Sequence, residues 1–312
     1  MDAEVVVADN ASTDDSLGMM AAEFPEVRTL ALEENFGFTG GYNRALAQVD
    51  AEYYLLLNSD IDVRDGWLQP LVSWMDNHPE CGACGPKLHS FIDRDRFEYA
   101  GAAGGYLDRY GYPFCRGRVL GKTEPDFGQY DKPKDVLWVS GACLMVRSSL
   151  WHDLGGLDER FFAHMEEIDL CWRAALKGYK VTVVPDSVVW HVGGATLPQS
   201  SPWKLQLNYR NNLLMLDNNL ASTVGRCRAR RIMTVRKMLD MMSAMVYLCT
   251  GKLQSCKAVM RAHREYRRLR RPHIVMQTCD VKGYLYGLCL LPQAFIRGNR
   301  IFTYLREYEN RH

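Results

Sequence analysis

The chain has 312 residues, enough for one large α/β domain and a smaller appendage, and its 47% hydrophobic and 24% charged residues are ordinary for a folded protein. The formal net charge of +1 excludes any whole-chain electrostatic argument about partners. Charge is uneven, however: residues 226–271 carry 14 Lys and Arg against two acidic residues, so the remainder of the chain is acidic. The apolar, uncharged stretches 241–251 and 283–296 are too short for a membrane-spanning helix.

The ten cysteines are scattered and lie mostly in apolar runs, which favours reduced thiols over a disulfide framework. Cys81 and Cys84 form a CxxC, but no second pair completes a zinc site of the usual kind. Since no signal peptide precedes the first expected strand, we expect a cytoplasmic location. Peripheral contact with the inner face of the plasma membrane is an alternative.

Strands and helices alternate over the first 77 residues. We expect strands at 4–8, 27–31 and 53–57, and helices from 16 onward, at 42–49 and at 67–77, with a glycine-rich loop at 35–41. These spacings predict a parallel, doubly wound sheet, in which ligands bind beyond the carboxyl ends of the strands. Asp9 and Asp60 follow two of those ends.

The second half of the chain changes from mixed to helical. The segment 84–135 is rich in Gly, Asp and aromatic residues and is expected to be irregular, followed by a strand-like run at 136–147, a helix at 166–177, and short strands at 181–184 and 188–192. From about residue 203 the pattern is helical. We therefore expect a boundary near residue 200, between a catalytic α/β domain (1–200) and a basic helical extension (201–312).

The first candidate for chemistry is Asn58-Ser59-Asp60. A carboxylate at the end of a buried strand can hold a hard divalent cation, which prefers oxygen ligands and can bridge to phosphate. The alternative is a polar turn that caps the next helix.

The second candidate is the acidic start of the helix at 166. Glu166, Glu167 and Asp169 crowd the positive end of the helix dipole, and repulsion among carboxylates can raise a pKa enough to make a base. Helix-start acidity alone also explains the cluster. We expect Asp169 and Arg173 to form a structural i, i+4 pair.

Three further features are ambiguous on their own. His191 lies in a strand-like run and is either a core residue or a metal ligand, the second only if Asp60 is nearby. Asp9 can accept the imide N–H of uracil or thymine, or simply form a turn. The glycines of 35–41 allow a ligand to approach the backbone closely.

Read in order, these segments resemble the family 2 glycosyltransferases of the GT-A fold. The resemblance rests on the following stretches: VADNASTD (7–14), NFGFTGGYN (35–43), LLLNSD (55–60), VSGACLMVR (139–147), GGLDERFF (155–162), EEIDLCWR (166–173) and VWH (189–191). It covers roughly residues 4–196, and several motifs in one order are more specific than any single motif. The rhamnosyltransferase-like enzymes of bacterial surface polysaccharides look closest, and the stretch 209–215 (YRNNLLM) also suits that group.

The resemblance implies a GT-A-type doubly wound, mostly parallel sheet and a metal-dependent hexosyltransferase that uses Mg²⁺ or Mn²⁺. It assigns Asp60 to the second acid of a DXD-type metal motif, with Asn58 in its first position and His191 completing the metal site. Glu167 matches the catalytic base, with Glu166 as the fallback. The implied donor site, for a UDP- or dTDP-linked sugar, consists of Asp9, Asn10, Asn35, Gly37, Gly41, Asn43 and Asn58.

The implied reaction is inverting, with a glycan or lipid-linked acceptor. The basic segment 226–271 either lies on an anionic membrane surface or forms a solvated face against the domain. Nucleic acid is not expected as a partner, because aromatic residues are sparse among these charges. Family members also begin with a further strand and helix before residue 4. The alternative function is therefore an inactive, truncated fragment with a non-catalytic binding role.

Overall fold

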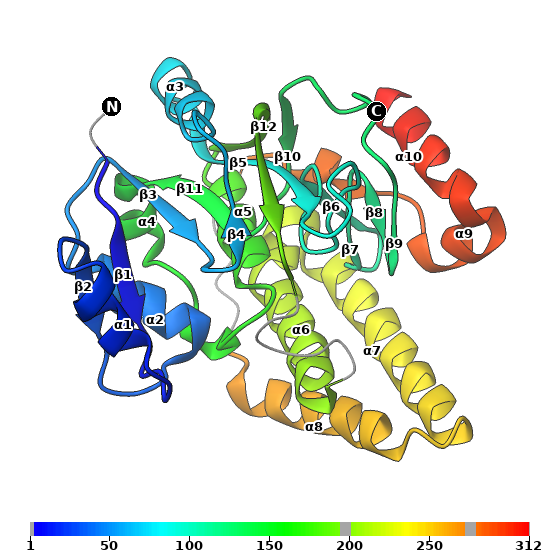
Figure 1. The fold of residues 1–312 in the computed structure, drawn as a ribbon. Coiled ribbons are helices and arrows are strands. Elements are labelled where there is room, and N and C mark those ends of the chain that lie inside the picture. The colour runs from blue at the N-terminus through cyan, green and yellow to red at the C-terminus, as the bar shows by residue number, and fades with distance from the viewer. Residues whose placement is uncertain (1–2, 194–200, 272–278, 312) are drawn as a thin grey trace.

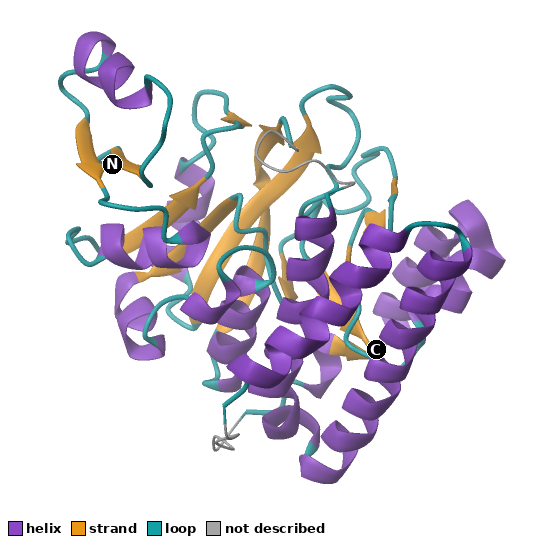
Figure 2. Ribbon diagram, turned by 90° about the horizontal axis from the view of Figure 1, so that it is seen from below, coloured by secondary structure: helices purple, strands orange, loops and turns teal. Residues whose placement is uncertain are grey.

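The fold is described from a computed structural model, which covers residues 3–193, 201–271 and 279–311. A small parallel sheet comes first, formed by β1 (Val6–Asp9) and β2 (Arg28–Ala31) with α1 (Ser16–Glu23) between them. This sheet lies apart from the main sheet, beside α2 (Gly37–Leu46) (Figures 1 and 2). The expected parallel pairing of the first two strands is therefore present.

The main sheet is mixed. Its strands are β3 (Tyr53–Leu57), β4 (Ile61–Asp62), β5 (Cys81–Ser90), β10 (Lys134–Val136), β11 (Cys143–Arg147) and β12 (Lys180–His191). The order is β10-β12-β5-β11-β3, with β4 on the end of β12; β5 and β12 pair in parallel and the other pairs are antiparallel. The prediction that the first three strands share one sheet is wrong: β1 and β2 form a sheet of their own, and β3 is an edge strand of the main sheet, paired with β11.

Two other segments differ from expectation. The glycine-rich run is not a loop, since α2 begins at Gly37, inside it. The two short strands expected around Pro185 are one continuous strand, β12, with a register shift between Val183 and Val188. A β-bulge lets the ladder with β5 continue past the proline, which has no N–H to donate.

A third sheet takes four of its five strands from the segment that was expected to be irregular. It is formed by β6 (Gly105–Asp108), β7 (Pro113–Cys115), β8 (Arg118–Val119), β9 (Lys122–Thr123) and, from the C-terminal part, β13 (Leu285–Tyr286). Strand β13 pairs in parallel with β6. The end of the chain is thus hydrogen-bonded to its middle.

Helices surround the sheets. They are α3 (Gln69–Asn77), α4 (Ser148–Leu154), α5 (Glu166–Leu176), α6 (Pro202–Val224), α7 (Arg226–Cys249), α8 (Leu253–Leu269), α9 (Leu290–Arg297) and α10 (Ile301–Arg311), with short 3₁₀ turns at Glu159–Phe161, Lys282–Tyr284 and Gly298–Arg300. The long helices α6, α7 and α8 pack against one another beside the main sheet (Figures 1 and 2). None of the helices in the described ranges has the length and hydropathy needed to cross a bilayer.

One hydrophobic core runs across residue 200. It contains Trp138 and Trp172 beside the sheet, and also Leu213 and Leu216 of α6. Helix α6 therefore buries its apolar side in the same core as the sheet. The domain boundary at residue 200 remains a prediction, but the helices beyond it share their core with the α/β part.

Candidate active site

Strand pairing brings Asp60 and His191 together from 131 residues apart in the chain. Asp60 precedes β4, and Ile61 of β4 pairs with His191 at the end of β12. As a result, the His191 Nε2 atom lies 3.1 Å from Asp60 Oδ1, and the Val192 N–H donates to the Asp60 carbonyl. The condition under which His191 was expected to be a ligand is met.

A second carboxylate lies on the other side of the imidazole. The Glu98 Oε2 atom is 3.4 Å from His191 Nδ1, and the same carboxylate accepts a hydrogen bond from the Ala100 N–H. Burial would lower the pKa of His191, but Glu98 and Asp60 outweigh burial and raise that pKa above its ordinary value. The sequence analysis missed Glu98. This residue lies in the segment that was expected to be irregular, and the only feature that marks it in the sequence is a carboxylate between two aromatic residues, Phe97 and Tyr99.

The geometry of Asp60 and His191 fits a hard divalent cation. An octahedral ion with bonds of about 2.1 Å holds neighbouring ligands about 3 Å apart, close to the Asp60–His191 separation. Mg²⁺ commonly keeps several waters and takes one or two protein ligands plus substrate phosphate. In the described part of the chain, no cluster of three or more His, Cys, Asp or Glu side chains is arranged to hold a metal alone. Phosphate and water would therefore supply the other positions.

Glu166 and Glu167 begin helix α5. Glu166 is buried and Glu167 is half-buried, and each has a buried Oε2 atom without a hydrogen-bond partner among the described residues. Burial raises the pKa of Glu167 to about 7, and burial together with repulsion from Glu167 raises the pKa of Glu166 well above its usual range. A carboxyl group with a pKa near 7 can accept a proton at neutral pH.

A buried cation lies near this pair. Arg118, on β8, is 8% exposed and its charge pulls the pKa of Glu167 slightly downward, against the larger effect of burial. The Arg118 guanidinium also donates to Cys115 Sγ and lies over the ring of Tyr99. Sequence reasoning did not find Arg118, because no motif surrounds it.

The loop that carries Asp60 and the carboxylate pair both approach one turn, residues 140–142. The Asn58 N–H donates to the Ala142 carbonyl at 2.9 Å. At Gly141, a Cβ atom would lie 3.3 Å from the Glu167 Cβ and 3.6 Å from the ring of Phe38. Two sequence-distant candidates, the loop of Asp60 and the side chain of Glu167, therefore border the same turn.

Asp9 and Asn10 lie at the end of β1, beside the start of α2. The buried Asp9 accepts a hydrogen bond from the Ser12 N–H through Oδ2. Asn10 accepts from the Phe36 N–H and donates to the Gly37 carbonyl. Asp9 and Asn10 therefore form a polar turn, which was the alternative to a role in base recognition.

The remaining residues expected in the donor site are engaged in similar contacts. Asn35 accepts from the Gly37 N–H at 2.9 Å, and a Cβ at Gly41 would lie 3.2 Å from the Asn10 amide nitrogen. These side chains hold the N-terminus of α2 close to β1. Their contact with a donor remains a prediction.

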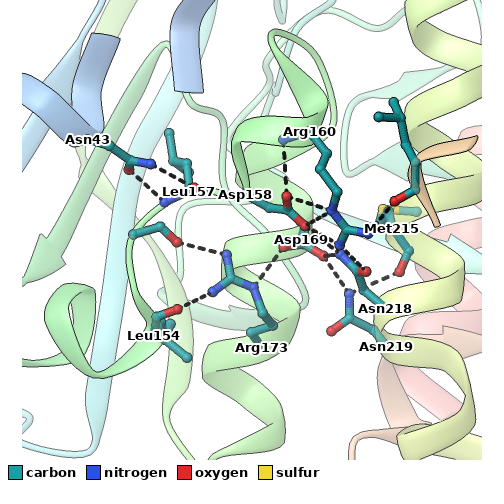
Figure 3. Close-up of polar contacts among 12 residues, drawn as sticks. Asn43, Leu154, Leu157, Asp158, Arg160, Asp169, Arg173, Met215, Asn218 and Asn219 are labelled. Carbon is teal, nitrogen blue, oxygen red and sulfur yellow. Dashed lines mark hydrogen bonds and ion pairs between the residues drawn. The ribbon is translucent and has the colours of Figure 1, made fainter. Parts of the chain in front are cut away.

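Asn43 points elsewhere. Its amide donates to the Leu157 carbonyl at 2.8 Å and accepts from the Leu157 N–H at 2.9 Å (Figure 3). Both polar atoms are thus paired with one backbone residue, and we do not assign Asn43 a donor contact. It borders a cavity of about 560 Å³ between the 154–160 segment and α6, while another cavity of about 510 Å³ lies around Trp74 and Tyr284. The lining of these two cavities does not include Asp60, His191 or Glu167.

Two family models match the chain. One, described as "Glycosyl transferase family 2", matches residues 1–151, and the other, "Glycosyl transferase family group 2", matches residues 122–252. Together they extend from the first strand through the end of α7.

Curated relatives also match the chain. The N-acetylglucosaminyl-diphospho-decaprenol L-rhamnosyltransferase of Mycobacterium tuberculosis is 30% identical over 210 residues, which is 60% of this chain and 66% of that protein. The O-antigen biosynthesis protein RfbC of Myxococcus xanthus is 29% identical over 215 residues, which is 66% of this chain but 16% of that protein. This chain thus corresponds to only part of the length of each relative.

Solved structures resemble the fold. A crystal structure of GalNAc-T7 with UDP, GalNAc and Mn²⁺ matches 69% of this chain and 41% of that chain, with a TM-score of 0.53 and 18% identity. The S. aureus TarS structure matches 98% of this chain and 49% of that chain, with a TM-score of 0.51 and 16% identity. At these identities the likeness concerns the fold.

Proposed function

Because this chain belongs to glycosyl transferase family 2, we propose that it transfers a sugar from a nucleoside-diphosphate donor to an acceptor hydroxyl in surface-polysaccharide synthesis. The expected GT-A-type α/β fold is confirmed by the solved structures that it resembles. The observation that carries the proposal is the approach of the Asp60 loop and Glu167 to one turn at 140–142, with His191 in contact with Asp60.

Asp60 and His191 are proposed to hold Mg²⁺ or Mn²⁺ together with the donor diphosphate. The metal would offset the negative charge that develops on the leaving diphosphate. The 3.1 Å separation of the two side chains supports this assignment, as does the Mn²⁺ and UDP in the GalNAc-T7 structure. The Glu98 carboxylate lies 3.4 Å from the Nδ1 atom of His191, and this charge would favour the ring orientation in which Nε2 faces Asp60.

Glu167 is proposed as the general base. Its unpaired Oε2 atom and a pKa near 7 suit removal of the proton from the acceptor hydroxyl. The hydroxyl oxygen then attacks the anomeric carbon from the side opposite the diphosphate, and the configuration inverts. Glu166 remains the fallback for this role; it is more deeply buried than Glu167, and burial together with repulsion from Glu167 raises its pKa well above the usual range.

The donor base is proposed to be uracil or thymine, read by Asp9. Because Oδ2 of Asp9 is bound to Ser12, the imide N–H would be accepted by Oδ1. Asn10, Asn35, Gly37 and Gly41 would shape this end of the donor site, and Asn58 would supply a neutral oxygen near the metal.

A lipid-linked glycan is proposed as the acceptor. The name of the mycobacterial relative specifies such an acceptor, a sugar on diphospho-decaprenol. Contact with an anionic membrane surface would bring the active site to a lipid-linked substrate. Three exposed methionines of α7, Met238, Met242 and Met245, support this contact, as does the exposed Lys252 between α7 and α8.

A transfer assay tests the proposal. Purified protein is incubated with UDP- and dTDP-linked sugars, a lipid-linked acceptor and Mn²⁺, and EDTA should abolish transfer until Mg²⁺ or Mn²⁺ is restored. Glu167→Gln should lower turnover by about 10²- to 10⁴-fold while donor affinity is retained. Glu307→Gln, on the exposed side of α10, is the control. Unchanged turnover in Glu167→Gln would move the base role elsewhere, and donor binding without transfer would favour the non-catalytic alternative.

A further inference from the structure

The segment that leads into the Glu166–Glu167 pair has an unusual backbone. Phe162, His164 and Met165 all adopt left-handed conformations, with φ of 64°, 74° and 74°. Residues with a side chain rarely adopt this region, and they persist there only when surrounding contacts enforce it. Three such residues directly before the proposed base imply that another part of the fold holds this turn, residues 161–165, in place.

Helix α6 supplies those contacts through Asn211. The Asn211 Nδ2 atom lies 2.9 Å from the Phe161 carbonyl oxygen and 2.7 Å from the carbonyl oxygens of Ala163 and His164, so that one amide group binds three carbonyls of the turn. Asn211 has no solvent exposure. The Arg210 guanidinium donates to Asn211 Oδ1 through Nε and to the Phe161 carbonyl through Nη2, and the first of these bonds sets the orientation of the amide.

A second anchor lies one turn further along α5. Asp169 is fully buried and accepts hydrogen bonds from Asn218 and Asn219 of α6 through Oδ1, while Arg173 binds its Oδ2 (Figure 3). This arrangement confirms the expected Asp169–Arg173 pair and adds α6 to it. Glu166 and Glu167 therefore lie between two sites of hydrogen bonding to α6: the 161–165 turn before them and Asp169 after them.

We propose that Asn211 is a positioning residue: by binding the carbonyls of the 161–165 turn, it directs Glu167 toward the turn at 140–142. The catalytic part of this inference rests on the proposed function, because Glu167 acts as the base only in a transferase. It also makes α6 part of the catalytic unit. The same contacts give a function to Arg210 and Asn211 of the stretch 209–215, which is not part of the proposed donor or metal sites.

The neighbouring residue offers a matched control. Asn212 is 1% exposed and donates one hydrogen bond to the Gly111 carbonyl, away from the turn. Replacing either asparagine by alanine removes a buried amide from the same helix, so both variants should lose stability. Only Asn211→Ala removes the contacts to the 161–165 turn.

The first measurement is hydrogen exchange, which needs no activity. In Asn211→Ala, the amides of residues 160–169 should exchange about tenfold faster than in the wild type, whereas in Asn212→Ala they should not change. If Asn211→Ala does not fold, Asn211→Ser, which keeps one donor, is measured in its place. Unchanged exchange in the Asn211 variant overturns the inference, whether or not the wild type transfers sugar.

The second measurement separates the inference from the proposed function. In the transfer assay, Asn211→Ala should lower kcat by about 10- to 100-fold with little change in the donor KM, because a displaced base slows the chemical step. An equal loss of kcat in Asn212→Ala would overturn the positioning role. Faster exchange in Asn211→Ala, combined with a wild type that transfers no sugar, would uphold the structural part and reject the transferase.

Discussion

Glu166 is a carboxyl group held inside the protein next to a second one. Burial, and repulsion from Glu167, raise its pKa well above the ordinary value, and burial raises the pKa of Glu167 to about 7. Each group therefore binds a proton more tightly in the folded than in the unfolded chain. The stability that each carboxyl group gains from this tighter proton binding is fully present below the ordinary carboxyl pKa. It is lost as the pH rises through the pKa of the group in the folded protein.

Glu166→Gln should therefore stabilise the protein in a pH-dependent way. Gln is uncharged in both states, so the variant avoids the cost of keeping a carboxyl group protonated. We expect its free energy of unfolding, relative to wild type, to be higher at pH 8 than at pH 5 by about 1 to 3 kcal/mol. Urea unfolding at the two pH values measures this, with Glu307→Gln as an exposed control. The same difference at both pH values would contradict the raised pKa.

The pKa of Glu167 predicts the pH profile of transfer. A general base works when deprotonated, so kcat/KM should be constant above pH 7 and fall about tenfold per pH unit below it. Initial rates between pH 5.5 and 8.5 at saturating metal measure the profile. A rate that does not change with pH across this range would argue against Glu167 as the base.

At the scale of elements, α2 shows how polar loops set a helix start. The N–H groups of its first turn have no partner within the helix, and Asn10 and Asn35 bind those of Phe36 and Gly37. Gly37 itself has φ +70°, and a Cβ there would lie 2.5 Å from the Phe162 ring. The glycine thus brings α2 against the 161–165 turn.

Gly37→Ala should separate these two elements. The substitution adds left-handed strain and a clash with Phe162, so we expect a loss of about 2 to 4 kcal/mol in the free energy of unfolding. Gly66→Ala is the control, since Gly66 has φ +78° and open space around its Cβ position. It should lose only about 1 kcal/mol. Equal losses, measured by urea unfolding, would mean that the contact with Phe162 carries no weight.

At the scale of the whole molecule, the basic segment is divided between interior and surface. Arg236 is 4% exposed and pairs with the buried Asp240, which also binds His263. In contrast, Met238, Met242 and Met245 are about two-thirds exposed on α7, and Lys252, between α7 and α8, is also exposed. The surface of α7 and of the turn that follows it thus combines apolar and cationic groups, as a helix that lies on a membrane surface does.

Vesicle flotation tests the membrane contact. The protein should float with vesicles of anionic phospholipid at 0.1 M salt and less at 1 M salt, because salt screens the cationic contribution. Replacing Met242 and Met245 by Ser should weaken flotation, whereas Phe295→Ser, on the exposed side of α9, should not. Absence of binding at both salt concentrations would remove the membrane from the proposal.

The sequence alone determined the family, the chemistry of the candidate residues and most local elements. The motifs around Asp60, Glu167 and His191 predicted that these side chains share one site; the contact of Asp60 with His191 is present, and the roles of the three residues remain predictions. The strand of residues 53–57 and the Asp169–Arg173 pair also follow from local pattern, since apolar runs and i, i+4 spacing act over a few residues.

Only the tertiary structure decided which distant segments of the chain contact one another. That β3 pairs with β11, that Glu98 lies against His191, and that Asn211 binds the 161–165 turn all depend on contacts between segments far apart in the chain. A single sequence records the propensity of each segment but not which distant segment completes its hydrogen bonds. Buried polar groups must find such partners, and the packing of the whole chain selects them.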